Sequence, residues 1–154
     1  MIEIDIPKRG VFTLEHAVFD VNGTLATDGR LIQDVKPLLD ILRRRLKVQM
    51  LTADTHGKQR EINRILGFEA TIITGGAEQK AEIIHELGAD KVVAIGNGAN
   101  DTAMFKVAAL SIAVLGDEGL AIPALLAADA VVHHIHDAIN MLLFPDRMRA
   151  TLRS

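Results

Sequence analysis

The segment from Phe19 to Gly29 reads FDVNGTLATDG, and it follows the short apolar pair Ala17-Val18. The apolar residues predict a buried strand, and Asp20 stands where that strand would end. Gly23 would let the backbone approach a bound anion closely, with consecutive N–H groups free to face it. The segment therefore predicts a carboxylate nucleophile beside a phosphate-binding turn. The alternative is a strand followed by an ordinary Asn-Gly hairpin turn.

The composition limits the classes of protein to which the chain can belong. It has 154 residues, and 49% of them are hydrophobic, which fits a globular domain with its own core. We expect residues 1–154 to form this domain, with 1–15 as an N-terminal β extension and 16–154 as the core. The net charge of -3 gives no electrostatic basis for binding nucleic acid or an anionic membrane.

Cysteine and long apolar segments are both absent from the sequence. Without cysteine there is no disulfide, no thiolate nucleophile and no cysteine-ligated metal. The N-terminus lacks the basic and then apolar pattern of a signal peptide, and no apolar run approaches the length of a bilayer span. These features predict a cytoplasmic protein.

Short apolar runs alternate with amphipathic segments along the rest of the chain. We expect an Asp-Gly hairpin over 26–31 and a helix that Asp34 caps. Further helices are expected at 57–66, 78–87, 101–109, 122–127 and 137–143, and strands at 48–52, 71–73, 91–95, 111–115 and 130–132. This alternation predicts a three-layer α/β fold with a mostly parallel central sheet. The stretches 2–6 and 11–14 are expected to add a small antiparallel pair to a sheet edge.

Polar residues stand at the ends of several expected strands. Thr52 ends one strand, and the turn that begins at Gly96 ends another. Lys80 opens a helix on the same side of the expected sheet. Ligands of such sheets bind beyond the carboxyl ends of the strands, so we expect these residues to converge with Asp20.

Four motifs in this order resemble those of the haloacid dehalogenase (HAD) superfamily of phosphotransferases. They are Asp20-Val21-Asn22-Gly23-Thr24, the hydroxyl residue in Leu51-Thr52-Ala53-Asp54, Lys80, and Gly96-Asn97-Gly98-Ala99-Asn100-Asp101. The last two thirds of the chain resemble the phosphorylation domain of P-type ATPases in particular. The resemblance implies a HAD-like Rossmannoid fold and a hydrolase of the phosphatase type, in a soluble P-type ATPase-like subgroup.

The resemblance also implies a role for each motif residue. Asp20 would attack phosphorus to form an aspartyl-phosphate, with Thr52 and Lys80 as the other catalytic residues. Mg²⁺ would be held by Asp20, the Asn22 backbone carbonyl and Asp101, with the Asn97 amide beside it. The phosphate would be bound by groups of Asn22, Gly23, Thr24, Thr52, Ala53, Lys80 and Asn100. Asn100 could equally orient Asp101 or cap a helix.

Two amides replace carboxylates of the common family pattern. Asn22 stands at the position of the general acid, and an amide cannot protonate a leaving group, so weak activity on alkyl phosphates is expected. Asn97 leaves one negative charge fewer at the metal site. The alternative function is therefore a catalytically impaired protein that binds phosphate and Mg²⁺ and acts through protein–protein contacts.

The segments between the motifs are too short for a cap domain. Residues 21–51 and 53–79 each hold a hairpin or strand and a helix, which implies an open site and excludes the nucleotide-binding domain of an ion pump. An open site fits a small phosphorylated substrate or a phosphoprotein. It also favours a homo-oligomer, a dimer or tetramer, in which a neighbouring subunit covers the site, and an exposed edge at 2–6 would support self-association.

Two further features have alternative interpretations. His133-His134-Ile135-His136 resembles a metal-binding cluster but lacks acidic partners, and a polar loop is the favoured interpretation. Asp54 either contacts the site or caps the next helix, and the cap is favoured. The stretch Gly116-Asp117-Glu118-Gly119 is expected to form a turn.

Overall fold

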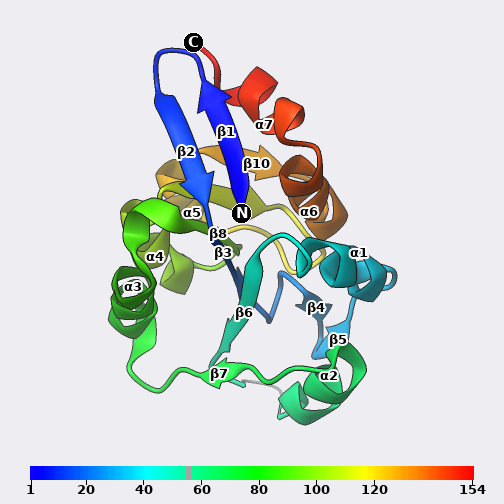
Figure 1. Cartoon of the computed structure of the whole chain (residues 1–154). Coiled ribbons are helices and arrows are strands. Elements are labelled where there is room, and N and C mark those ends of the chain that lie inside the picture. The colour runs from blue at the N-terminus through cyan, green and yellow to red at the C-terminus, as the bar shows by residue number, and fades with distance from the viewer. Residues whose placement is uncertain (55–56) are drawn as a thin grey trace.

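The centre of the computed structural model is a six-stranded sheet with the order β10-β9-β8-β3-β6-β7 (Figure 1). The structure describes residues 1–54 and 57–154. The strands are β3 (His16–Asp20), β6 (Lys47–Thr52), β7 (Thr71–Ile72), β8 (Val92–Gly96), β9 (Leu110–Val114) and β10 (Ala130–Val132). All neighbouring pairs are parallel, which confirms the predicted α/β class.

Helices cover both faces of this sheet (Figure 1). One face carries α1 (Val35–Leu42), α2 (Gln59–Leu66), α6 (Ile135–Leu143) and α7 (Pro145–Leu152), and the other carries α3 (Gly76–Leu87), α4 (Thr102–Val107) and α5 (Ile122–Ala127). Short 3-10 turns, η1 (Ala89–Lys91) and η2 (Ala99–Asp101), precede β8 and α4. Alternate residues of β3 enter the two cores: Phe19 packs with the first set of helices and Val18 with the second. The result is the three-layer fold that the sequence predicts.

β3 is the central strand, and this position decides where the site lies. Each of its residues is buried, and it pairs with β6 on one side and β8 on the other. Strands buried on both faces are almost wholly apolar, so the carboxylate of Asp20 at the end of β3 is an exception with a functional meaning. β6 ends in Thr52 and β8 ends in Gly96, which places both beside Asp20.

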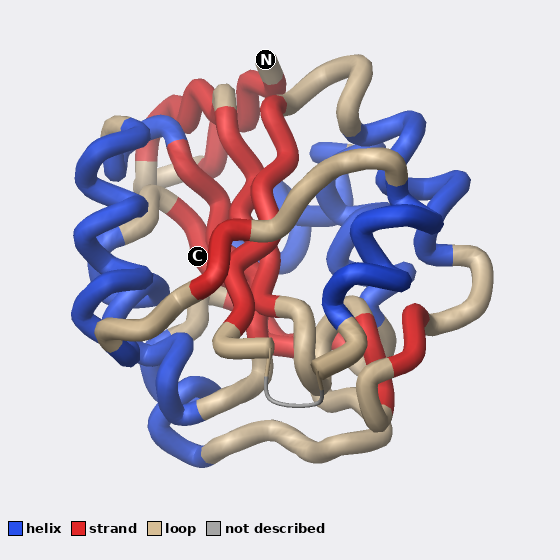
Figure 2. Tube along the Cα trace, turned by 90° about the horizontal axis from the view of Figure 1, so that it is seen from below, coloured by secondary structure: helices blue, strands red, loops and turns tan. Residues whose placement is uncertain are grey.

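A short hairpin follows the nucleophile turn. It consists of β4 (Ala26–Thr27) and β5 (Arg30–Leu31), joined by Asp28 and Gly29 with φ of 52° and 77°. Positive φ at both turn residues is typical of a type I′ turn and confirms the predicted hairpin. Figure 2 looks onto this end of the molecule, where loops cross the strand ends. In the described residues the segments between the motifs hold the hairpin with α1 and then α2 with β7, without a cap domain.

The N-terminal strands differ from the sequence expectation. β1 (Ile2–Ile6) and β2 (Gly10–Leu14) form a two-stranded sheet of their own rather than an addition to the main sheet. Ile2, Ile4 and Ile6 are buried in the core that also contains Met148 of α7. Glu3 and Asp5 point outward, and charged residues disfavour pairing with a further strand. In the described residues β1 pairs only with β2, so one side of β1 has no strand partner, and self-association through this edge stays a prediction. The division into 1–15 and 16–154 stays a prediction.

The structure contains one helix that was not predicted, α7, and α3 is extended at its start. α7 was not expected, because only Met148 of its residues is buried and the segment shows no apolar periodicity. The sequence features that favour a helix here are Pro145 at the first position, Asp146 in the first turn and Arg149 in the last turn. α3 begins at Gly76 rather than at 78, so Lys80 lies one turn inside the helix.

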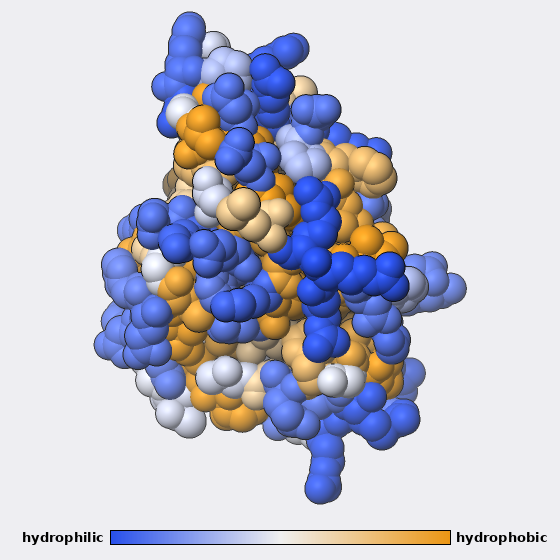
Figure 3. All heavy atoms as spheres, in the orientation of Figure 1, coloured by the Kyte–Doolittle hydropathy of each residue, from blue (hydrophilic) through white to orange (hydrophobic). Residues whose placement is uncertain are grey.

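The surface in Figure 3 is mainly hydrophilic, with a strongly polar band across its centre. The exposed residues Arg43, Arg44 and Arg45 lie between α1 and β6, and the exposed Lys47 is the first residue of β6. In the described part of the chain, none of the helices combines the length and the apolar character needed to cross a bilayer.

Candidate active site

Lys80 joins two carboxylates at the buried centre of the site. Its Nζ donates to Asp20 Oδ1 at 2.8 Å and to Asp101 Oδ1 at 2.7 Å. The side chains of Lys80, Asp20 and Asp101 are 1%, 8% and 0% exposed. Buried charges are tolerated only when they are paired and hydrogen-bonded, which this arrangement achieves. The fold thus brings together these three residues, as the sequence predicts.

The site is short of positive charge. Burial, reinforced by the negative charge of Asp101, raises the pKa of Asp20 to about 7, although Lys80 and Thr24 act in the opposite direction. Burial alone would lower the pKa of Lys80, but the two carboxylates outweigh it and raise that pKa. Lys80 is therefore a fixed cation, and one lysine does not fully compensate two buried carboxylates.

Asp101 is oriented by the backbone of its own loop. Its Oδ2 accepts from the N–H groups of Asn97 at 3.0 Å and Gly98 at 2.9 Å, so Oδ1 is left for Lys80. Asn100 is exposed, and its side chain lies against Gly98. Backbone amides, rather than Asn100, fix this carboxylate.

The hydroxyl of Thr52 is prepared as a hydrogen-bond donor. Its Oγ1 accepts from Asn22 Nδ2 at 3.3 Å and from the Asp54 N–H at 2.9 Å. A hydroxyl oxygen accepts two hydrogen bonds and donates one, so its own hydrogen remains for an anion. Ala53 follows at the exposed rim. Asp54 Oδ1 in turn accepts from the N–H of Gln59, the first residue of α2, so its side chain binds the helix start as the favoured interpretation expects, although Lys58 is the N-cap residue.

The turn after Asp20 uses its N–H groups internally. The N–H of Gly23 donates to the carbonyl of Ala26 at 2.8 Å, and that of Thr24 donates to the carbonyl of Val21 at 3.1 Å. The expectation that consecutive N–H groups of Gly23 and Thr24 face an anion is therefore wrong in this structure. These bonds instead hold the turn rigid beside the nucleophile.

The Asn97 side chain connects the nucleophile turn to a second loop. Thr24 Oγ1 lies 3.2 Å from Asn97 Oδ1 and 3.4 Å from Asp20 Oδ2, and its one hydrogen can serve either. Asn97 Nδ2 donates to the carbonyl of Gly119 at 3.1 Å, in the expected turn at 116–119. Glu118 of that turn accepts from the N–H of Asp28 at 3.1 Å and so anchors the hairpin. No local feature of the sequence indicates these long-range links.

We expect Gly23→Ala to destabilise the protein more than Gly67→Ala. Both glycines have positive φ, 81° and 79°, so both variants lose stability through backbone strain of about 1 kcal/mol. A Cβ on Gly23 would lie 2.3 Å from Asn97 Nδ2, whereas a Cβ on Gly67 would meet nothing within 4 Å. Forced contacts of this kind cost a further ~1–3 kcal/mol. Urea unfolding measures both losses, and equal losses would show that Gly23 does not pack against Asn97.

The oxygen ligands at the centre fit Mg²⁺. In the described residues no three His, Cys, Asp or Glu side chains gather in a metal-binding group. The two carboxylates of Asp20 and Asp101 can be completed by the Asn22 carbonyl, the Asn97 amide and water, and Mg²⁺ prefers few carboxylates and several waters. A divalent cation would also supply the missing positive charge. The residues present therefore fit the ion.

The histidines of the segment 133–136 make contacts within the fold. His136 Nε2 is 2.7 Å from the carbonyl of Gln33, and the N–H of His134 bonds Asp137 Oδ2 at 3.3 Å at the start of α6. These contacts tie a loop and a helix start to their neighbours.

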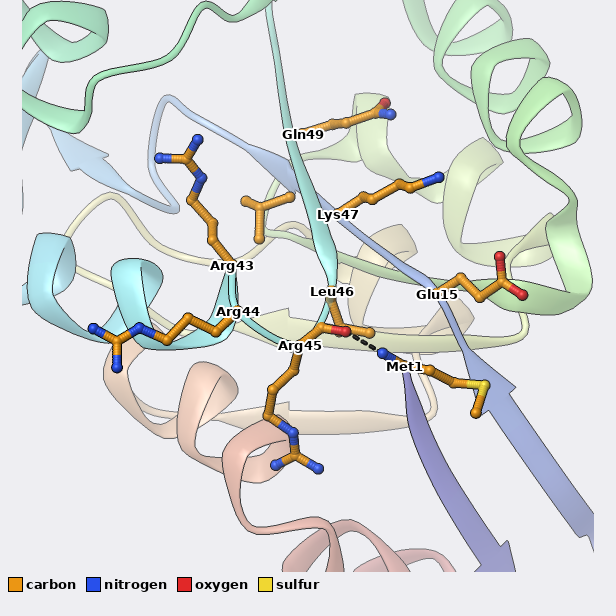
Figure 4. Close-up of a pocket in the computed structure, with 9 residues that line it drawn as sticks. Met1, Glu15, Arg43, Arg44, Arg45, Leu46, Lys47 and Gln49 are labelled. Atoms are coloured by element: carbon orange, nitrogen blue, oxygen red, sulfur yellow. Dashed lines mark hydrogen bonds between the residues drawn. The ribbon is translucent and has the colours of Figure 1, made fainter.

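A basic cavity of ≈ 590 Å³ lies at the opposite end of the sheet, where β6 begins (Figure 4). Its arginines do not converge on one point. Arg43 stacks over Phe68 at 4.3 Å from the ring centre, and Arg45 Nη1 donates to the carbonyl of Leu143 at 3.1 Å. Figure 4 shows Arg44 directed away from Lys47. The cavity is separate from the carboxylate site.

Known proteins share both the sequence and the fold of this chain. A family model of haloacid dehalogenase-like hydrolases matches residues 75–133. An uncharacterized protein of Methanocaldococcus jannaschii is 44% identical over 78 residues, which cover 48% of this chain and 84% of that protein. A probable copper-exporting P-type ATPase of Archaeoglobus fulgidus is 35% identical over 96 residues, 61% of this chain but only 12% of the ATPase.

A solved structure supports the same assignment at the level of the fold. The cobalt-bound deoxy-D-mannose-octulosonate 8-phosphate phosphatase of Haemophilus influenzae superposes with a TM-score of 0.66 and 20% sequence identity. The match covers 92% of this chain and 94% of the phosphatase. The family model includes Lys80 and the whole loop from Gly96 to Asp101, which are the residues that complete the carboxylate site. The chain therefore belongs to the haloacid dehalogenase-like hydrolases.

Proposed function

We propose that the chain is a Mg²⁺-dependent phosphatase that acts through an aspartyl-phosphate on Asp20. The observation that carries this proposal is the buried bridge from Lys80 to Asp20 and Asp101. Apolar residues often replace a buried ion pair without loss of stability, so a scaffold has no need for this set. Family membership and the open end of the sheet support the same conclusion.

These residues support a mechanism of two successive displacements at phosphorus. A carboxylate oxygen of Asp20 forms a bond to phosphorus as the ester P–O bond breaks, and the alcohol oxygen leaves with the bond electrons. Thr52 holds a phosphoryl oxygen with its free hydrogen, while Lys80 offsets negative charge. Water then attacks phosphorus, releases inorganic phosphate and restores Asp20. Asn22 can neither protonate the alcohol nor activate the water.

Asp20 and Asp101 would hold Mg²⁺, together with the Asn22 carbonyl and with Asn97 nearby. Bound there, the ion neutralises charge on the phosphoryl group during transfer. Asn97 also accepts a hydrogen bond from the Thr24 hydroxyl through its Oδ1 and donates one to the turn at 116–119 through its Nδ2. An amide suits this position because it has both an acceptor oxygen and a donor nitrogen.

We expect Asp101→Asn to weaken Mg²⁺ binding by more than about tenfold, because it removes one of two carboxylate ligands. The variant keeps the side-chain shape, so the fold should remain. Asp40→Asn removes the same charge from a half-buried residue that is paired with Lys36 away from the site, and it is the matched control. Calorimetry with MgCl₂ alone measures both. Unchanged affinity in Asp101→Asn would remove Asp101 from the metal site.

The second candidate is a phosphate-binding and Mg²⁺-binding protein that acts through protein contacts. Asn22 favours it, since the general acid is missing. The two candidates differ in Asp20-dependent turnover, which a steady-state screen of aryl, acyl and alkyl phosphates with Mg²⁺ measures. The phosphatase releases phosphate only with Asp20 intact, whereas the binding protein releases none.

Self-association into a dimer or tetramer stays a prediction. Besides the edge of β1, α5 offers a surface for it, since Ile122 and Leu126 are 64% and 79% exposed. A neighbouring subunit on α5 would lie close to the site, because the Ala121 N–H before this helix donates to the carbonyl of Asn97 at 2.9 Å.

A further inference from the structure

A cleft of ≈ 560 Å³ lies between the β4–β5 hairpin and α2. Its walls combine cations with apolar side chains. Arg30 and Leu31 come from the hairpin, and Lys58, Arg60, Ile62 and Ile65 come from the start and body of α2.

Both walls of the cleft are connected through the chain to residues of the candidate active site. The hairpin starts at Ala26, whose carbonyl accepts from Gly23 in the turn after Asp20. α2 starts at Gln59, whose N–H is bound by Asp54, two residues after Thr52. Lys58 Nζ donates to the carbonyl of Asp28 at 3.2 Å and joins the two walls. The cleft therefore lies between the two segments that lead away from Asp20 and from Thr52.

The charged side chains of the cleft are mainly positive. Its acid, Glu61, is already bound by Arg64, at 3.0 Å through Nε and 2.5 Å through Nη2. In the described residues neither Arg30 nor Arg60 lies within 4.0 Å of a carboxylate. A guanidinium group pairs well with planar or tetrahedral oxyanions. The cleft thus offers two arginines without acidic partners, beside an apolar wall, on a protein whose net charge is -3.

We propose that this cleft binds a second acidic group on the leaving-group part of the substrate. The substrate is then a small phosphate ester whose alcohol carries a carboxylate or a further phosphate. Arg30 and Arg60 bind the acidic group, and Leu31, Ile62 and Ile65 contact the carbon body. This inference rests on the proposed phosphatase function and narrows its substrate class.

The test compares three aryl phosphates that differ in one substituent: 3-carboxyphenyl, 3-phosphonophenyl and 3-carbamoylphenyl phosphate. The carbamoyl ester is the neutral match of the carboxyl ester in size. We expect the wild type to show a higher kcat/KM for an acidic ester than for the neutral one. The larger of the two ratios identifies the acidic group. Raised ionic strength should reduce the preference, because the arginines are exposed.

Arg30→Gln and Arg60→Gln should each lower this preference by about two- to fivefold, the range of an exposed ion pair. Arg44→Gln is the matched control, since it removes the same charge from an exposed arginine at the other end of the sheet. It should leave the preference unchanged. A wild type without preference, or an equal loss in Arg44→Gln, would overturn the proposal.

Measurements of ester binding distinguish the failure of this proposal from the failure of the phosphatase proposal. In Asp20→Asn, the dissociation constants of the three esters are measured by calorimetry with MgCl₂. Discrimination in binding without Asp20-dependent turnover in the wild type overturns the phosphatase proposal and leaves the cleft as an anion site. Turnover without discrimination overturns the cleft alone. Absence of both turnover and binding overturns both.

Discussion

Asp20→Asn should lower phosphatase turnover by at least about a thousandfold, the scale on which loss of a nucleophile acts. The amide is a poor nucleophile, and it keeps the shape of the carboxylate inside a site where the side chain is 8% exposed. The measurement is steady-state release of phosphate from an aryl ester with Mg²⁺. Trapping of an acid-stable phosphoprotein in the wild type, and its absence in the variant, would identify the attacking residue.

Asp40→Asn serves as the control for this change too, because it converts the same side chain at a half-buried position outside the site. It should retain wild-type turnover. Circular dichroism checks that Asp20→Asn is folded. If folded Asp20→Asn hydrolyses the ester as the wild type does, the enzymatic proposal fails and the binding-protein alternative replaces it.

Asn22→Asp should raise turnover of alkyl phosphates by about a hundredfold, the typical contribution of a general acid. The side chain at this position already points into the site, because Asn22 Nδ2 lies 3.3 Å from Thr52 Oγ1. A carboxylic acid there could protonate the alcohol oxygen and later activate water. Repulsion from Asp20 and a hydrogen bond from Thr52 to the new carboxylate both act against the gain.

The signature of this gain is its selectivity. Aryl and acyl phosphates have leaving groups that need no protonation, so Asn22→Asp should favour an alkyl ester over a matched aryl ester. The wild type should also hold its aspartyl-phosphate longer than Asn22→Asp does. The double variant with Asp20→Asn should be inactive on both esters. Equal changes for the alkyl and aryl esters would contradict a role for position 22 in proton transfer.

The sequence by itself predicted the strands of the central sheet and the order of the site motifs along the chain. Apolar runs of strand length marked β3, β6 and β8, and each has its polar residue at the end, as predicted. Asp28-Gly29 and Gly67 marked a hairpin turn and a helix end, where the structure has positive φ. These features are predictable because they depend on side-chain periodicity and on backbone preferences of neighbouring residues.

Only the tertiary structure decided which groups remain available in the site. The N–H groups of Gly23 and Thr24 are consumed within their turn, while Thr52 keeps its hydrogen because Asn22 and Asp54 fill its lone pairs. Ile2, Ile4 and Ile6 were expected at an exposed edge, but the core beside α7 buries them. Periodicity tells which side of a strand is apolar but not what covers it. A group's hydrogen-bond partners come from residues far apart in the chain, so strand order and packing decide them, and local sequence cannot.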